Sequence, residues 1–190
     1  LRGTSERAKA LADFGATRIV VRPTPVEPKT SARLRALLDD PETSAERVRM
    51  AMIESYRAYA TEAAAAFGSA LEAVAGAGGR PVLVHCTAGK DRTGFLVAVL
   101  QAALGVPQPL IFEEYLATNR HWDRASVSGH LPMTSEAIEP VLVADPDYLA
   151  AAFEEIDRHD GSVAAFIHRA TAGRVTPAHL ETMLERSQTL

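Results

Sequence analysis

The middle of the chain carries a long helical pattern. Thr43 and Glu46 have the spacing of a capping box, in which each side chain bonds the free amide of the other residue. From there apolar residues recur at helical intervals as far as Val74, where a glycine-rich stretch ends the pattern. The spacing predicts one long helix that begins at Thr43, and Phe67-Gly68 is the place where it could divide.

Two apolar segments follow, separated by a loop. Residues 81–84 read Pro-Val-Leu-Val, which is typical of a strand buried on both faces of a sheet. Residues 95–104 are apolar on nearly all sides, which indicates a buried helix. The connection is residues 85–94, His-Cys-Thr-Ala-Gly-Lys-Asp-Arg-Thr-Gly. The pattern therefore predicts a buried strand that leads into a buried helix through a tight loop.

The two ends of the chain differ in their predicted elements. Near the start, a helical pattern over 4–14 precedes a β-branched strand over 17–22, which ends at a proline-rich, mobile loop because proline cannot donate to a sheet ladder. The other end is expected to contain helices over residues 109–118, 145–161, 162–173 and from 176 onward, with a loop containing helical turns over 119–144. Together these elements predict an α/β fold with a central sheet flanked by helices and a helix-rich C-terminal half.

Composition and charge agree with a folded globular protein. The 190 residues are 47% hydrophobic and 23% charged, and the net charge of -4 provides no basic face to gather nucleic acid. No stretch reaches the roughly 18 apolar residues of a membrane span, and the first residues are charged instead of forming an apolar signal core. We expect one cytoplasmic domain over 1–190, without membrane insertion, in which strands at the N-terminus are missing from the sequence.

Cys86 is the only cysteine of the sequence. It cannot form an internal disulfide, and a zinc site built from several cysteines is excluded. The histidines show no spacing typical of metal ligands, so no metal or cofactor is expected. An isolated cysteine beside an apolar run is usually an inert core residue, and the neighbours of Cys86 decide whether it is a reactive thiol instead.

Those neighbours predict an anion site. A tight loop before a buried helix directs backbone amides and the positive end of the helix dipole at one point. Lys90 and Arg92 add cationic donors, and the planar fork of an arginine matches two phosphate oxygens. Such surroundings stabilise the thiolate of Cys86, which is the nucleophilic form. A nucleotide-binding loop is excluded because Val84 and Asp91 stand where its glycine and Ser/Thr are required.

The loop resembles the signature loop of the cysteine-dependent protein tyrosine phosphatases, with five residues between Cys86 and Arg92. The complete run is similar to the bacterial branch of that family, whose loop reads His-Cys-x-x-Gly-Lys-Asp-Arg-Thr-Gly. Four further segments extend the likeness over most of the chain, at residues 54–59, 79–83, 114–119 and 147–152. One departure is that residues 19–22 run straight into Pro23, where related chains continue into a long acidic loop. We hypothesise that residues are missing at this point.

The resemblance implies a two-step displacement. Cys86 is expected to attack phosphorus and form a thiophosphate that water then hydrolyses. The phosphoryl oxygens are expected to be held by Arg92 together with the loop residues Thr87, Ala88, Gly89 and Lys90. Thr93 is expected to donate its hydroxyl to the sulfur, and His85 to orient the loop.

The acid that protonates the leaving group is less clearly indicated. Asp91 in the loop is characteristic of the bacterial branch, and it could instead be a structural hydrogen-bond acceptor. Other tyrosine phosphatases place the acid on a separate loop, for which Glu27, Asp39 or Asp40 could serve.

The expected function is a metal-independent protein tyrosine phosphatase. Its expected substrates are phosphorylated proteins, with phosphoserine, phosphothreonine or phosphoinositides as further candidates because a lysine in the loop can contact a second phosphate. Lys90 could instead be merely a solvated charge. The alternative function is a pseudophosphatase that binds phosphate without turnover. The sequence predicts no oligomeric state.

Overall fold

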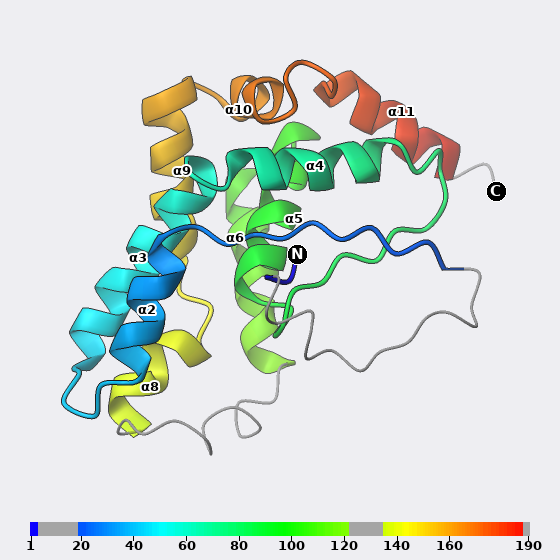
Figure 1. The fold of residues 1–190 in the computed structure, drawn as a ribbon. Helices are drawn as coiled ribbons and strands as arrows, with labels where there is room; N and C mark the ends of the chain where they lie inside the picture. Colours follow the sequence, from blue (N-terminus) through cyan, green and yellow to red (C-terminus); the bar gives the residue numbers. More distant parts are fainter. Residues whose placement is uncertain (4–18, 122–134, 188–190) are drawn as a thin grey trace.

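The computed structural model describes residues 1–3, 19–121 and 135–187, and this part of the chain is mostly helical (Figure 1). The helices in chain order are α2 (Thr30–Leu38), α3 (Ala45–Ala60), α4 (Ala64–Ala75), α5 (Asp91–Ala103), α6 (Gln108–Ala117), the 3₁₀ helix η1 (Thr118–Arg120), α8 (Ser135–Leu142), α9 (Pro146–Asp160), α10 (Val163–Ala170) and α11 (Pro177–Ser187). Helix α3 packs against α2, α8 and α9, while α4 packs against α10.

The prediction of an α/β fold with a central sheet is wrong, because no described residue lies in a strand. Val82 and Leu83 of the predicted buried strand are 46% and 86% exposed. A strand forms only where a neighbouring segment completes its hydrogen-bond ladder. Residues 19–22 and 81–84 form no strand with another described segment, and the helices bury one another instead. The predicted helix over 4–14 lies outside the described residues.

The predicted long helix is two helices. Its N-cap is Ser44, whose hydroxyl accepts from the Arg47 amide at 3.4 Å, one residue later than predicted. The break comes at Thr61, between α3 and α4, and Phe67-Gly68 lies inside α4. Helix α2 falls where the sequence indicated a mobile loop.

The helix starts predicted at Asp145 and Ser162 are confirmed. Asp145 caps α9 by accepting from the Asp147 amide at 2.9 Å, and Ser162 caps α10 by accepting from the Ala165 amide at 3.1 Å. Gly161 ends α9 in the left-handed conformation, with φ at 77°. Cap residues act on the nearest turn, so the sequence alone identifies them.

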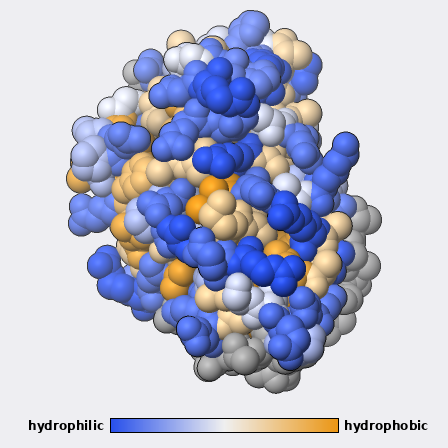
Figure 2. Space-filling model, turned by 90° about the vertical axis from the view of Figure 1, so that its left-hand side faces the viewer, coloured by the Kyte–Doolittle hydropathy of each residue, from blue (hydrophilic) through white to orange (hydrophobic). Residues whose placement is uncertain are grey.

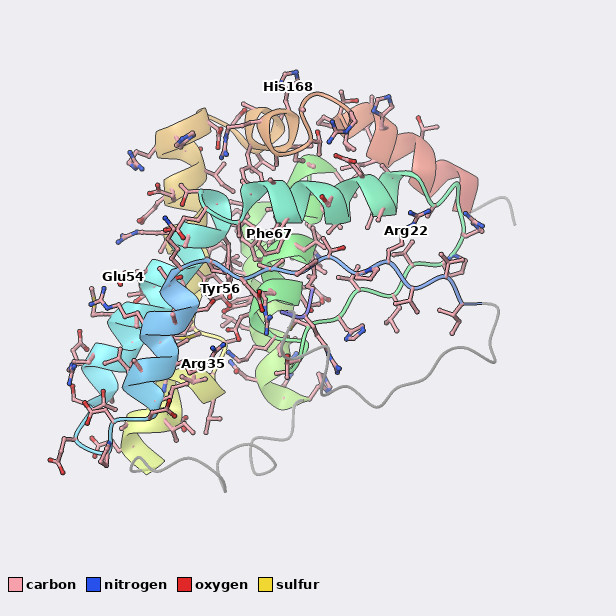
Figure 3. All side chains as sticks on the ribbon, in the orientation of Figure 1. Arg22, Arg35, Glu54, Tyr56, Phe67 and His168 are labelled. Atoms are coloured by element: carbon pink, nitrogen blue, oxygen red, sulfur yellow. The ribbon has the colours of Figure 1, made fainter. Side chains whose placement is uncertain are left out.

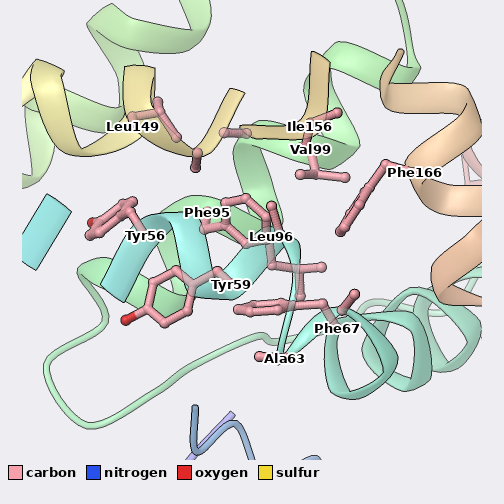
Figure 4. Close-up of a cluster of buried hydrophobic side chains, with 14 of the residues drawn as sticks. Tyr56, Tyr59, Ala63, Phe67, Phe95, Leu96, Val99, Leu149, Ile156 and Phe166 are labelled. Atoms are coloured by element: carbon pink, nitrogen blue, oxygen red, sulfur yellow. The ribbon is translucent and has the colours of Figure 1, made fainter. Parts of the chain in front are cut away.

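Aromatic side chains fill the core between α3, α4, α5 and α10 (Figure 4). Phe67 and Phe95 meet edge to face with their ring centroids 4.7 Å apart, and Tyr59 and Phe166 extend the group on either side. All four side chains are at most 7% exposed. This cluster holds the first turns of α5, and with them the end of the preceding loop, against the rest of the molecule.

Gly68 allows α4 and α10 to approach closely. A Cβ atom at this position would overlap the backbone carbonyl of Ala170. The backbone of α10 cannot give way as a flexible side chain can, so only glycine fits here.

Figure 2 shows the face formed by α2, α3, α8 and α9, where hydrophilic side chains cover most of the surface and apolar ones appear between them in small groups. Ion pairs cross this face, among them Arg33–Glu54 at 2.5 Å and Arg49–Asp145 at 3.7 Å. Within the described residues, no helix combines the length and the apolar character that crossing a bilayer requires.

Candidate active site

The signature loop, residues 85–94, leads directly into α5. Gly89 has a φ of 72°, a left-handed conformation that favours glycine and turns the chain toward the helix. Lys90 is the N-cap of α5, and its side chain does not cap the helix. The first-turn amides of α5 thus lie at the end of the loop, and the anion site that the loop-helix pattern predicts there stays a prediction.

Cys86 lies at the base of this loop and is 3% exposed. The carbonyl of the preceding residue, His85, accepts a hydrogen bond from the Leu1 nitrogen at 3.0 Å. The His85 ring donates from Nδ1 to the Cys86 carbonyl oxygen at 2.9 Å. These contacts fix the backbone on both sides of the cysteine, and the orienting role expected for His85 stays a prediction.

Arg92 folds back along the loop toward its beginning. Its guanidinium donates to the Thr87 hydroxyl at 3.4 Å and to the Leu1 carbonyl at 3.2 Å. The structure thus brings Arg92 to the residue that follows Cys86, although five residues separate the two in the sequence. A planar cationic group placed beside the cysteine is the arrangement that a phosphoryl group requires.

Lys90 points into the protein and not toward the opening of the loop. The residue is 1% exposed, and its ammonium donates to Asp91 Oδ1 at 2.5 Å and to the Val143 carbonyl at 3.0 Å. The same Asp91 oxygen accepts from the Tyr56 hydroxyl at 3.0 Å, and the Tyr56 and Tyr115 hydroxyls are 2.7 Å apart. A buried ammonium is stable only when its donors find acceptors, and this polar network supplies them.

The tyrosine hydroxyls of the network stay protonated at ordinary pH. Burial, followed by the nearby Asp91 carboxylate, raises the pKa of Tyr56 and of Tyr115 well above the usual value. Tyr56 extends from α3 into the interior (Figure 3). Its hydroxyl therefore acts as a donor to Asp91 and connects α3 to the first residue of α5.

The remaining site residues predicted from the sequence are Thr93 and the loop residues Ala88 and Gly89. The hydroxyl of Thr93 is buried and has no hydrogen-bond partner among the described residues. Its bond to the Cys86 sulfur stays a prediction. Ala88 and Gly89 are exposed at the outer turn of the loop.

The alternative acids differ in their positions. Asp39 and Asp40 lie at the turn between α2 and α3, which Figure 1 shows well apart from the loop, and Asp40 pairs with Arg47 at 3.5 Å. The Glu27 carboxyl group instead lies against Gly3, close to the Leu1 residue that contacts the loop.

A hollow of about 350 Å³ adjoins the outer turn of the loop. Its walls are formed by Ala88 and Gly89 on one side and by Glu114, Ala117, Thr118 and His121 on the other. The sequence indicated no site role for α6, because a helical pattern reveals which residues share a face but not what that face lies against. Of the described residues, none form a group of three or more histidine, cysteine, aspartate or glutamate side chains that could hold a metal ion.

Comparisons with known proteins find relatives among the phosphatases. The chain is 32% identical over 124 residues to the triple specificity protein phosphatase PtpB of Mycobacterium tuberculosis, which corresponds to 57% of this chain and 45% of that protein. It is 39% identical over 99 residues to a "putative tyrosine-protein phosphatase" of Cupriavidus necator, over 49% of this chain and 36% of that protein. The chain thus spans less than half the length of either relative.

The sequence model of the tyrosine phosphatase family matches residues 1–186, nearly the whole chain and all of the signature loop. With Cys86 and Arg92 held in one loop at the start of α5, the chain belongs to the tyrosine phosphatase family.

Proposed function

We propose that this chain is a cysteine-dependent phosphatase that hydrolyses phosphotyrosine-type phosphomonoesters through a thiophosphate intermediate. One observation carries the proposal: the guanidinium of Arg92 folds back to Thr87, beside Cys86, at the N-terminus of α5. Nucleophile, cationic fork and the first-turn amides then belong to one loop at the start of a helix, where a phosphoryl group would bind.

In the first step, the Cys86 thiolate forms a bond to phosphorus as the bond from phosphorus to the ester oxygen breaks. Arg92 and the loop amides balance the charge on the three equatorial oxygens. The departing oxygen takes a proton from a carboxylic acid or from water. In the second step, water attacks phosphorus, the sulfur leaves as thiolate with Thr93 as its hydrogen-bond donor, and inorganic phosphate is released.

Two roles are predicted for Asp91, a catalytic acid and a structural hydrogen-bond acceptor, and its contacts favour the structural role. One of its oxygens already accepts from Lys90 and from Tyr56. Among the alternative acids that the sequence indicated, Glu27 is supported by its position, since it lies against the N-terminal segment that contacts the loop. We therefore assign loop anchoring to Asp91 and the proton donor role to Glu27.

The name of the mycobacterial relative, a triple specificity phosphatase, supports a substrate range wider than phosphotyrosine. The hollow beside Ala88 and Gly89 agrees with this, because it offers room for a group larger than a phenyl ring next to the loop. Phosphoserine, phosphothreonine and phosphoinositides are therefore included in the proposed range.

The test is hydrolysis of phosphotyrosine and phenyl phosphate in the presence of a chelator, compared with Cys86→Ser. The wild-type chain should turn over without metal, and the variant should lose about 10³-fold or more of kcat, because a hydroxyl is a far poorer nucleophile than a thiolate. The affinity of Cys86→Ser for inorganic phosphate should persist, since the amides and Arg92 are unchanged. Phosphate binding by the wild-type chain without turnover would identify it as a pseudophosphatase.

A further inference from the structure

Asn119 makes a two-sided contact with the backbone of Ala144. The side-chain Nδ2 of Asn119 donates to the Ala144 carbonyl at 2.8 Å, and the Ala144 amide donates to Asn119 Oδ1 at 2.7 Å. The Ala144 side chain is 3% exposed, so water is a poor substitute for the asparagine. Both polar groups of this peptide segment thus depend on one side chain from η1.

The residue before Ala144 connects this contact to the signature loop. The carbonyl of Val143 accepts from the Lys90 ammonium at 3.0 Å, and that ammonium also bonds Asp91 at 2.5 Å. Lys90 is the residue at which the loop ends and α5 begins. Two hydrogen-bonded steps therefore run from Asn119 to the signature loop, through the Val143–Ala144 peptide and Lys90.

The position of the Val143 carbonyl matters because Lys90 is buried. A buried ammonium that loses one of its acceptors must move to find another or bear a large desolvation cost. A shift of Lys90 moves the backbone at the end of the loop, where the first-turn amides of α5 adjoin the proposed anion site. Misplacement of such groups by about 1 Å can cost about a hundredfold in rate.

Two further contacts near this segment, both between described residues, hold other groups than Asn119 does. Arg49 approaches the same segment at Asp145, with 3.7 Å between Nε and Oδ2, and holds its side chain and not its backbone. The Tyr148 hydroxyl donates to the Pro140 carbonyl at 3.0 Å, on the other side of Val143. Neither contact fixes the direction of the Val143 carbonyl as directly as the two bonds to the next residue do.

We propose that Asn119 is a positioning residue of the phosphatase site: it fixes the Val143–Ala144 peptide segment so that the Val143 carbonyl holds Lys90, and Lys90 holds the end of the signature loop. The inference rests on the proposed function above. Asn119 acts through Lys90 and has no contact with the loop itself among its described hydrogen bonds.

The test compares Asn119→Ala, Lys90→Met and the double variant in kcat and KM for phenyl phosphate. Asn119→Ala should lower kcat by about tenfold or more, and should change KM less, because misdirected amides affect the transition state most. The double variant should be no slower than Lys90→Met, since both changes remove the same connection. Losses that multiply in the double variant would overturn the proposal.

Tyr148→Phe is the matched control. It removes one hydrogen bond from the packing of α8 on α9 without touching Val143 or Ala144. Its Tm should fall while its kcat stays within about twofold of wild type. If Tyr148→Phe and Asn119→Ala lower kcat equally at equal loss of Tm, general loosening explains the effect and the proposal is wrong.

A second variant and a second measurement separate this inference from the proposed function. Asn119→Asp has the same size and keeps the acceptor for the Ala144 amide, but it loses the donor, so it should be slowed in the same way. Affinity for inorganic phosphate, measured by calorimetry, should weaken in both Asn119 variants even if the wild-type chain shows no turnover. Unchanged phosphate affinity together with unchanged kcat would contradict the positioning role.

Discussion

Lys90 and Arg92 are two cationic residues of one loop whose charged ends have different surroundings. The Arg92 guanidinium is partly exposed and contacts Thr87, whereas the Lys90 ammonium is buried against Asp91 and Val143. An arginine fork matches two phosphoryl oxygens, while a lysine is a single point charge that can serve as an internal anchor. The chemistry of each side chain thus suits the place it occupies.

The variant Asp91→Asn tests whether this single residue anchors the loop or donates the proton. An anchoring role predicts that this variant slows phosphotyrosine and an activated nitrophenyl phosphate by similar factors, of about tenfold, because the loop shifts for both substrates. A proton donor would instead be needed mainly by the poor leaving group. Selective slowing of phosphotyrosine hydrolysis would make Asp91 the acid. Glu27→Gln serves as the reference in the same comparison, because it removes the residue assigned as the proton donor and should slow phosphotyrosine selectively.

At the scale of elements, the close packing of α4 on α10 depends on Gly68. Gly68→Ala should lower the free energy of unfolding by about 1–3 kcal/mol, because the added methyl group overlaps the Ala170 backbone and the helices must separate. Chemical denaturation measures this loss. Ser69→Ala, on the exposed side of the same helix, should change stability little. Equal stability of Gly68→Ala and wild type would mean that the two helices can move apart freely.

At the scale of the whole molecule, one ion pair joins three helices. The Arg169 side chain bonds both oxygens of Asp160, at 2.5 and 2.8 Å, and also donates to the Ala60 carbonyl at the end of α3. The hydrogen bonds from Arg169 hold the pKa of Asp160 below its usual value of 3.8. A carboxyl group with a lowered pKa contributes stability that is present above the unfolded-state pKa and lost as pH falls through the folded-state pKa.

Asp160→Asn should therefore destabilise the chain at neutral pH and much less in acid. Near pH 7 we expect a loss of about 1–2 kcal/mol in the free energy of unfolding, since the arginine is partly exposed. Below about pH 4 the difference between variant and wild type should shrink. Urea unfolding at several pH values checks this, and a difference that does not depend on pH would contradict it. Glu155→Gln, which breaks a more exposed pair with Arg158, should have a smaller effect.

The sequence by itself determined the local features of this protein. The capping residues Asp145 and Ser162 and the left-handed Gly161 act within one turn of the chain, so their neighbours in the sequence suffice to identify them. The same holds for Cys86 and Arg92, whose spacing in one loop is enough to predict an anion site and the family.

Only the tertiary structure decided which segments meet. An apolar run predicts burial or a strand, yet no described segment completes a ladder at Leu83, and its side chain is exposed. The direction of Lys90 depends on the Val143 carbonyl, 53 residues later in the chain, and that carbonyl depends on Asn119. Contacts between residues far apart in sequence arise from the packing of helices, and no local pattern records them.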